Sequence, residues 1–180
     1  MSQSSIKHLI NQLLNSKDIE DVILELYKSE SFFAFILKFN DSIIAAVDPT
    51  RTYPILYKPS EKKFEIGNYN LISNYIELTI EHSEVEIFLS TGYSLGEKTI
   101  FSEVLSIPAG KVLVYKDNEY YLKQYHRYKP KLFNHDKQFF TDENLYEELN
   151  NVLNAAIKTT IENANGKRIL LSLSAGFDSR

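Results

Sequence analysis

Residues that could bind a phosphate or a metal ion lie close to position 180 of the sequence. They form one continuous run: Ser174, Ala175, Gly176, Phe177, Asp178 and Ser179. This run follows Ile169–Leu173, a short apolar segment typical of a buried strand of a parallel sheet. A loop of small residues after such a strand can turn backbone N–H groups toward a phosphate, while serine hydroxyls donate and the Asp178 carboxylate holds Mg²⁺. The run predicts either a phosphate-binding loop or a plain turn, and it lacks the Gly-Lys-Ser/Thr of a Walker loop.

Other kinds of catalytic or metal site have little support in the composition. The chain has no cysteine, which excludes disulfides, thiolate metal sites and a cysteine nucleophile. Its four histidines show no metal-ligand spacing, so we expect no zinc site. They are His8, His82, His126 and His135. Asp48 and Arg51 are expected to pair within a buried loop and are assigned no catalytic role.

Charge and hydropathy limit the possible partners and the location. The net charge is −4, from 20 Lys+Arg against 24 Asp+Glu, which disfavours a general nucleic-acid binder. Tyrosines near residues 115–128 could stack bases, but alternation in a hairpin is more typical of packing. The apolar runs are too short to span a bilayer, and residues 1–5 do not resemble a signal peptide. We therefore expect a soluble, cytoplasmic protein without a membrane partner.

The elements before residue 129 alternate between helical and strand patterns. Residues 6–14 and 19–27 have helical periodicity, with Ser4 or Ser5 and Asp18 as candidate caps. Residues 32–47 predict a hairpin that turns at Asn40-Asp41, and residues 54–66 continue a meander. Residues 108–125 predict a further hairpin with its turn at 116–118.

A different organisation is expected beyond residue 128. Residues 129–141 have a linker composition. A long helix is predicted over 142–164, capped by Thr141 and closed by Asn165-Gly166. Its buried stripe is predicted to comprise Leu145, Leu149, Val152, Ala156, Ile157 and Ile161.

Several motifs, in order along residues 32–179, resemble the glutamine-hydrolysing asparagine synthetase family. The loop at 174–179 is similar to the Ser-Gly-Gly-x-Asp-Ser pyrophosphate loop of ATP pyrophosphatases, with Ala175 in place of the first glycine. Two stretches further upstream also resemble family motifs. The first is similar to Phe-Ala-Phe followed by Arg-Asp-x-x-Gly-x-x-Pro-Leu-Tyr. The second is similar to Gly-Tyr followed by Thr-Leu-Phe and then Leu-Pro-Pro-Gly. The matching residues are Phe33-Ala34-Phe35, Ala46-Val47-Asp48, Arg51, Pro54-Ile55-Leu56-Tyr57, Thr91-Gly92-Tyr93, Thr99-Ile100-Phe101 and Ile107-Pro108-Ala109-Gly110.

The resemblance implies an α+β fold with two parts. Residues 1–128 would form a degenerate glutaminase-like domain, an Ntn-hydrolase-like αββα sandwich, and 129–141 the linker. Residues 142–180 would be the first helix and strand of an α/β ATP-pyrophosphatase domain. The family adenylates a carboxylate, commonly that of aspartate, with Mg-ATP, and ammonia then displaces AMP. By resemblance, residues 174–179 bind the ATP pyrophosphate and Asp178 binds Mg²⁺.

Departures from the family pattern define what we expect of this chain. The family glutaminase uses an amino-terminal cysteine, which this sequence lacks, and Ser2 runs into a predicted helix that makes it a cap or free end rather than a nucleophile. Nitrogen would come from free ammonia or from a partner glutaminase. Because the adenine-binding residues of the family find no match before Arg180, we expect the amino-terminal portion of a longer ligase. The alternative is a non-catalytic binding module that forms a homo-oligomer.

Overall fold

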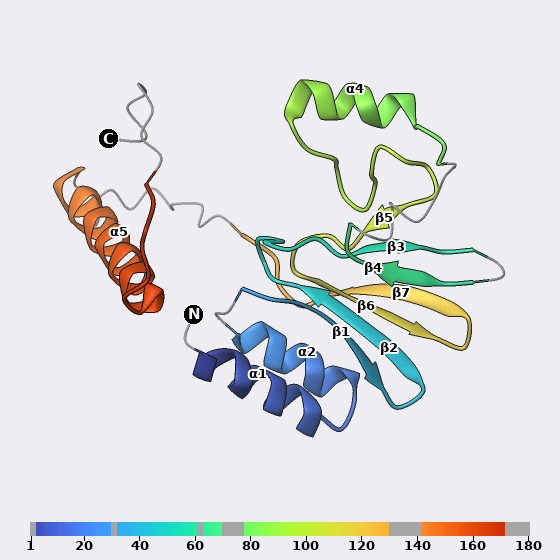
Figure 1. The fold of residues 1–180 in the computed structure, drawn as a ribbon, viewed down its shortest axis with the longest axis horizontal. Coiled ribbons are helices and arrows are strands. Elements are labelled where there is room, and N and C mark those ends of the chain that lie inside the picture. Colours follow the sequence, from blue (N-terminus) through green and yellow to red (C-terminus); the bar gives the residue numbers. More distant parts are fainter. Residues whose placement is uncertain (1–2, 30–31, 61–62, 70–77, 130–141, 172–180) are drawn as a thin grey trace. The chain divides into compact units, whose positions relative to one another are not determined.

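The computed structural model describes residues 3–29, 32–60, 63–69, 78–129 and 142–171 (Figure 1). It is an α+β protein with antiparallel sheets. The chain divides into two compact units, one of residues 11–129 and one of residues 1–10 with 130–180. The predicted linker, 129–141, lies outside the described residues except for residue 129, and so does Thr141, the predicted cap of the next helix.

Two helices open the chain. α1 spans Gln3–Asn15, so Ser4 and Ser5 lie inside the helix and the prediction that one of them caps it is wrong. α2 spans Ile19–Lys28, and its predicted cap is confirmed because Asp18 Oδ1 accepts from the Asp21 amide at 2.9 Å. The periodicity that predicted both helices is thus confirmed in type.

A four-stranded antiparallel sheet has the order β1-β2-β6-β7. β1 (Ala34–Phe39) and β2 (Ser42–Val47) form the first predicted hairpin, and β6 (Lys111–Lys116) and β7 (Glu119–Gln124) form the last. Both turns rely on left-handed backbone, at Asn40 (φ 52°) and at Asp117 and Asn118 (φ 51° and 64°), which these residue types tolerate. The inner strands β2 and β6 pair with Ala45 opposite Leu113.

A smaller antiparallel sheet has the order β4-β3-β5. It consists of β3 (Leu56–Lys58), β4 (Glu65–Gly67) and β5 (Leu105–Ser106). β3 and β4 belong to the predicted meander, and Tyr57 pairs with Ile66 on one side and with Leu105 on the other. The short β5 links the meander to the second motif region of the sequence.

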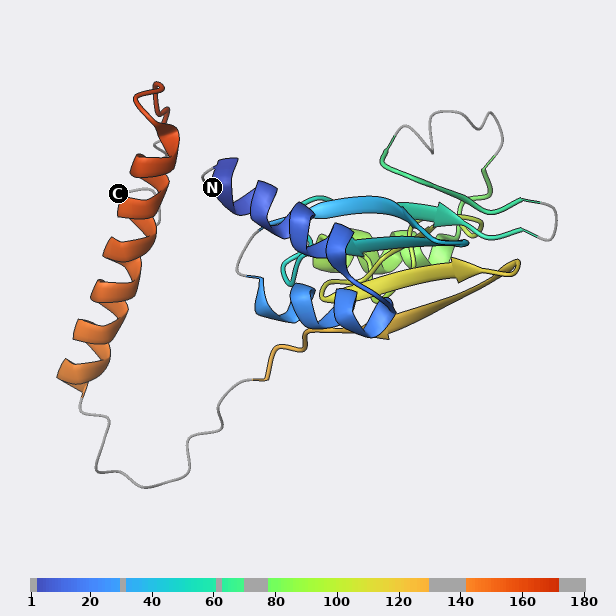
Figure 2. The same cartoon turned by 90° about the horizontal axis from the view of Figure 1, so that it is seen from below.

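The hydrophobic core lies between the two sheets. It is a cluster of six buried residues from both: Ala45, Val47, Ile55, Tyr57, Ile107 and Leu113. Figures 1 and 2 show α2 against one face of the four-stranded sheet and the smaller sheet against the other. α2 buries Val22 and Leu26, and Glu20 forms an ion pair with Lys123 of β7. A helix–sheet–sheet layering therefore holds this unit together.

The predicted packing of the tyrosines at 115–128 is confirmed for Tyr115, Tyr120 and Tyr125, whereas Tyr121 and Tyr128 are exposed. The rings of Tyr115 and Phe64 stack with centroids 4.2 Å apart, and Tyr120 meets Tyr57 edge-on at 5.4 Å. Phe64 precedes β4, so these contacts fasten the small sheet to the large one.

Sequence periodicity did not predict α4, which spans His82–Thr91. Gly92 in the sequence could have indicated where this helix ends. It adopts φ 81°, and its amide donates to the Phe88 carbonyl oxygen at 2.8 Å. Glu84 is buried, and its Oε1 accepts from Lys98 Nζ at 2.6 Å. α4 therefore meets the rest of its unit through a charged residue rather than an apolar stripe, so helical periodicity gave no signal.

The long helix α5 spans Asp142–Ala164, as predicted. Asn165 and Gly166 follow with φ of 46° and 77°, which confirms the predicted helix stop. The predicted burial of its stripe is wrong: Leu145, Leu149, Val152, Ile157 and Ile161 are all exposed. Because a stripe is buried only when another element lies on it, the pattern by itself could not decide this.

Candidate functional site

The predicted phosphate loop, Ser174 to Ser179, lies outside the described residues. The strand predicted before this loop, over residues 169–173, is wrong for its first three residues, and the last two lie outside the described residues. Ile169–Leu171 have no strand assignment, and their side chains are 54%, 85% and 77% exposed. A strand needs a neighbour to pair its backbone groups, and no such neighbour is found among the described residues.

The motif segments upstream meet around one buried carboxylate, that of Asp48. Asp48 follows β2 and is fully buried. Its amide donates to the Phe33 carbonyl oxygen at 2.9 Å, and the Phe33 amide returns a hydrogen bond to Asp48 Oδ2 at 3.2 Å. The Asp48 carbonyl oxygen accepts from Arg51 and Gly110 amides at 2.9 and 3.3 Å. Three stretches distant in sequence are thus joined at one residue.

Two threonines satisfy the Asp48 side chain. Oδ1 accepts from the Thr50 hydroxyl and amide at 2.7 and 2.9 Å, and both oxygens accept from the Thr52 amide at 3.2–3.3 Å. Burial alone would raise the pKa of Asp48, but the hydrogen bonds from Thr50 and Thr52 outweigh it and lower the pKa below its ordinary value. Asp48 is therefore an ionised, fully engaged acceptor, which suits a structural role and not proton transfer.

Arg51 contacts Asp48 through its backbone amide, and its guanidinium bonds elsewhere. Its Nη1 donates to Ser106 Oγ at 3.5 Å, while its backbone adopts φ 52°. Arg51 therefore connects the Asp48 loop to β5 of the small sheet. Asp48 and Arg51 therefore share a loop network, as predicted, and the contact between them is a backbone hydrogen bond.

Gly110, in the Pro-Ala-Gly match, closes this arrangement. It has φ 67°, and a Cβ placed on it would lie 2.4 Å from the carbonyl oxygen of His126. The Gly110 carbonyl oxygen accepts from the amides of Tyr125 and His126 at 3.0 and 3.1 Å. Tyr125 then donates its hydroxyl to the Val47 carbonyl oxygen at 2.5 Å. Only glycine fits this position without displacing the end of β7.

A groove lies between two outer strands of the same unit. Its volume is about 580 Å³. It lies beside the first residues of β1, the segment before β3 and the end of β4, and its lining comprises Ala34, Phe35, Ile36, Tyr53, Pro54, Ile55, Gly67, Asn68 and Tyr69. Tyr53 and Tyr69 are 61% and 66% exposed. None of the described residues that line this groove is charged, and most are apolar or aromatic.

A second polar contact lies at the edge of the core. The Tyr57 hydroxyl donates to Glu97 Oε2 at 3.0 Å, and Glu97 Oε1 lies 3.6 Å from Lys111 Nζ. Burial, followed by the hydrogen bond and charge of Glu97, raises the pKa of Tyr57 above its ordinary value. The phenol therefore stays protonated, and the cluster ties the β3 core to β6.

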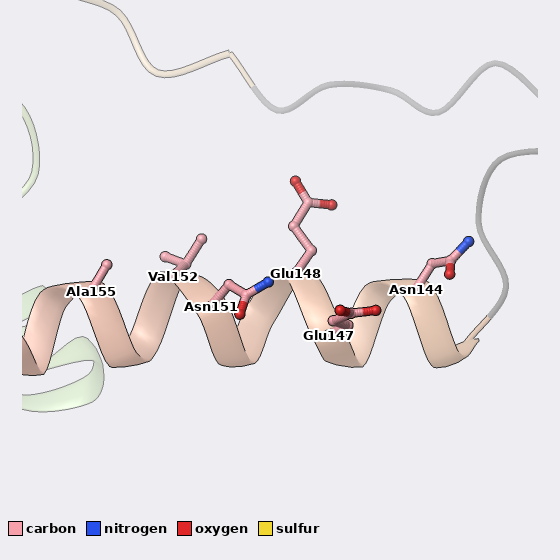
Figure 3. A pocket seen from close by; sticks show the side chains of 6 residues that line it. All are labelled: Asn144, Glu147, Glu148, Asn151, Val152 and Ala155. Atoms are coloured by element: carbon pink, nitrogen blue, oxygen red, sulfur yellow. The ribbon is translucent and has the colours of Figure 1, made fainter.

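Another hollow lies along a single helix, α5. Figure 3 shows its six lining side chains, which are Asn144, Glu147, Glu148, Asn151, Val152 and Ala155. All of the described lining residues belong to one helix, so this part of the hollow is a helix face. Within the described ranges no group of three or more His, Cys, Asp or Glu residues could hold a metal ion. None of the helices seen there has both the length and the apolar content needed to cross a bilayer.

Sequence reasoning missed Thr50, Thr52, Gly110 and Tyr125 as parts of the Asp48 network. Thr50 and Thr52 had a local signal, since Asp-x-Thr-x-Thr is a spacing at which side chains bond neighbouring backbone. Tyr125 had none, because its partner is 78 residues away. Comparison with known proteins adds no identification: no family model matches this chain, and no curated protein matches it either.

Proposed function

We propose that this chain is part of an asparagine synthetase-like, ATP-dependent amide ligase that adenylates a carboxylate and then amidates it. The observation that carries the proposal is the convergence of the matched motifs on Asp48. Phe33 precedes Asp48 by 15 residues and Gly110 belongs to the other motif stretch, and each bonds directly to Asp48, as does Arg51 of the same loop. Chance matches to the motifs would not be expected to contact one another in the fold. In a domain inherited from the family, these contacts are expected.

The finer architecture proposed for residues 1–128 is a degenerate Ntn-hydrolase-like αββα sandwich. The layering of α2, the four-stranded sheet and the small sheet supports it. In this proposal Asp48 has a scaffolding role, since its oxygens are already engaged by the loop that it closes.

ATP and Mg²⁺ are the proposed cofactors, and residues 174–179 are proposed to bind them. The donor set fits: Ser174 and Ser179 carry hydroxyls for phosphate oxygens, and Asp178 carries the hard oxygen ligand that Mg²⁺ prefers. Ala175 adds one methyl group where the family has glycine. ATP would supply the leaving group that makes the carboxylate reactive.

Nitrogen is proposed to come from free ammonia or from a partner glutaminase. The sequence contains no cysteine that could release ammonia from glutamine. The acceptor is proposed to be a carboxylate such as that of aspartate, and the location to be the cytoplasm. Glutamine-dependent amide formation by the purified protein alone would contradict the proposed nitrogen source.

The test is carboxylate-dependent exchange of labelled pyrophosphate into ATP, which reports the adenylation step without requiring ammonia. We expect the full-length ligase to which this chain belongs to catalyse exchange with aspartate and Mg²⁺, and to lose it in Asp178→Asn. Asp117→Asn is the matched control, because Asp117 lies in the β6–β7 turn at a φ that asparagine also adopts. Exchange that survives in Asp178→Asn would refute the assigned role of Asp178.

One observation favours a second candidate, a non-catalytic binding or oligomerisation module. The apolar stripe of α5 is exposed and available to a partner. This candidate predicts a folded protein whose melting temperature does not respond to Mg-ATP. Protection by Mg-ATP that disappears in Asp178→Asn would favour the ligase instead.

A further inference from the structure

β1 forms an open edge of the four-stranded sheet. Within the described part of the chain β2 is the only strand that pairs with it, from Ala34 opposite Val47 to Phe39 opposite Ser42. The strand reads Ala-Phe-Ile-Leu-Lys-Phe, so a single charged residue interrupts an apolar sequence. An edge of this kind is a template for a further strand, because one row of backbone N–H and C=O groups has no strand partner.

The contact between Phe33 and Asp48 shows which backbone groups of β1 face outward. The Phe33 carbonyl oxygen accepts from the Asp48 amide, and the Phe33 amide donates to Asp48 Oδ2, so the backbone of Phe33 faces the β2 side. Along an antiparallel pair, residues that bond the neighbouring strand alternate with residues that do not. The N–H and C=O groups of Ala34, Ile36 and Lys38 therefore face away from β2, toward the open edge.

The side chains of the same three residues share one face of the sheet, because side chains alternate along a strand. Ala34 packs against the core cluster between the two sheets, which identifies this face as the one toward the small sheet. Ile36 is 47% exposed, and Lys38 is exposed as well. A strand added at the edge places its own alternate side chains on this face, directly opposite those of β1.

The groove of about 580 Å³ described above lies beside this edge. Its lining includes Ala34 and Ile36 of β1, together with Tyr53, Ile55 and Tyr69. None of the described lining residues is charged, and the volume lies within the range of about 300–1,000 Å³ that is usual for binding sites. Because Ala34 is small, the groove has room for large apolar or aromatic side chains opposite Ala34 and Ile36.

Lys38 selects the charge of the residue opposite it. None of the ion pairs formed within the described ranges includes Lys38. The opposite edge of the sheet differs, because Lys123 of β7 is already paired with Glu20. Opposite charges that face each other across two strands attract, so an acidic residue on an added strand complements Lys38.

We propose that the β1 edge binds an extended peptide segment of a partner protein, antiparallel to β1. The segment carries an acidic residue opposite Lys38 and large apolar or aromatic residues two and four positions later, opposite Ile36 and Ala34. Backbone hydrogen bonds to the three outward-facing residues supply the affinity, while Lys38 and the groove supply the sequence preference. This inference rests on β1 and its groove and is independent of the proposed ligase function.

Fluorescence anisotropy of a labelled peptide, Thr-Glu-Thr-Leu-Thr-Phe-Thr, titrated with the full chain tests the backbone pairing. We expect saturable binding. Methyl groups on the backbone nitrogens of the peptide's Glu, Leu and Phe should abolish it, because these N–H groups face β1 in the proposed register. Methyl groups on the nitrogens of the two inner Thr residues, which face away, should change the dissociation constant far less. Equal effects of the two sets would overturn the proposal, and so would the absence of binding at millimolar peptide.

Lys38→Glu tests the charge of the partner segment. It should raise the dissociation constant for this peptide roughly tenfold at low salt, because like charges then face each other. A peptide with lysine in place of its glutamate should restore binding to the variant. Lys116→Glu is the matched control, since Lys116 is another exposed strand lysine, at the β6–β7 turn, and it should leave binding unchanged. Unchanged binding by Lys38→Glu would overturn the proposal.

Two measurements on the chain without peptide identify other occupants of the edge, and either would overturn the proposal. Self-association that the peptide reverses would show that a second copy of the chain pairs with β1. Strong hydrogen-exchange protection of the Ala34 and Ile36 amides in a monomer would show that another segment of the same chain already covers the edge. We expect a chain that does not associate through β1 and whose two amides become protected only when the peptide is added.

Discussion

Asp48 and Phe33 exchange two hydrogen bonds across the end of the β1–β2 hairpin. The Asp48 amide donates to the Phe33 carbonyl oxygen at 2.9 Å, and the Phe33 amide donates to Asp48 Oδ2 at 3.2 Å. A carboxylate thus replaces a backbone carbonyl as the acceptor at the point where the ladder ends. This lets the chain leave β2 and enter the Thr50–Thr52 loop without an unpaired amide.

Asp48→Asn tests this arrangement. Asparagine has one acceptor oxygen, so an NH₂ group would face the amides or hydroxyls that Asp48 now accepts from, and we expect a loss of about 1–3 kcal/mol in unfolding free energy. Urea denaturation followed by circular dichroism measures it. Asp41→Asn, an exposed turn residue of the same hairpin, should be close to neutral. Equal losses in the two variants would contradict the assigned role.

Asp48 should also affect stability at acid pH. The pKa of Asp48 is lowered in the folded protein, so its contribution to the free energy of unfolding is complete above the unfolded aspartate pKa of about 3.9. That contribution is lost as the pH falls through the folded pKa. The wild type should therefore lose stability more steeply than Asp48→Asn below about pH 4. Urea midpoints measured across this range for both proteins check the prediction, and parallel curves would refute it.

Gly110→Ala should destabilise the protein for two separable reasons. A left-handed φ costs an L-residue about 1–2 kcal/mol, and the new methyl group would also meet the His126 carbonyl oxygen. Gly92→Ala has the first penalty alone, because its φ is 81° and nothing lies within 4 Å of the added Cβ. We expect Gly110→Ala to lose roughly 1–3 kcal/mol more than Gly92→Ala. Equal thermal denaturation shifts would exclude the clash.

Tyr57 and Tyr125 should weaken the fold at alkaline pH. Burial is the first cause that raises the pKa of both phenols; Glu97 contributes at Tyr57 and the Asp48 charge at Tyr125. The unfolded chain releases these protons near pH 10. The contribution of the two phenols to the free energy of unfolding is therefore complete below about pH 10 and falls as the pH rises above it. Tyr57→Phe should make this fall shallower in urea midpoints measured from neutral to alkaline pH. An unchanged slope would contradict the prediction.

Local patterns in the sequence were enough to predict the features that depend on neighbouring residues. Asp18 caps α2, Asn40 and Asp117-Asn118 turn the two hairpins, and Gly166 follows the end of α5 at a left-handed φ. Each of these signals acts within a few residues of chain, so local conformational preference suffices to predict it. The carboxylate at Asp48 could be singled out in the same way, as part of a short Asp-x-Thr-x-Thr loop.

The contacts that those elements make depend on how the whole chain folds. The apolar run at 169–171 looked like a strand, yet a strand exists only where another strand pairs with it. The α5 stripe looked buried, yet burial depends on a partner surface that the helix does not encode. The partnership of Asp48 with Gly110 and of Tyr125 with Val47 spans most of a domain. Such contacts follow from how the sheets pack together, and no local pattern specifies that packing.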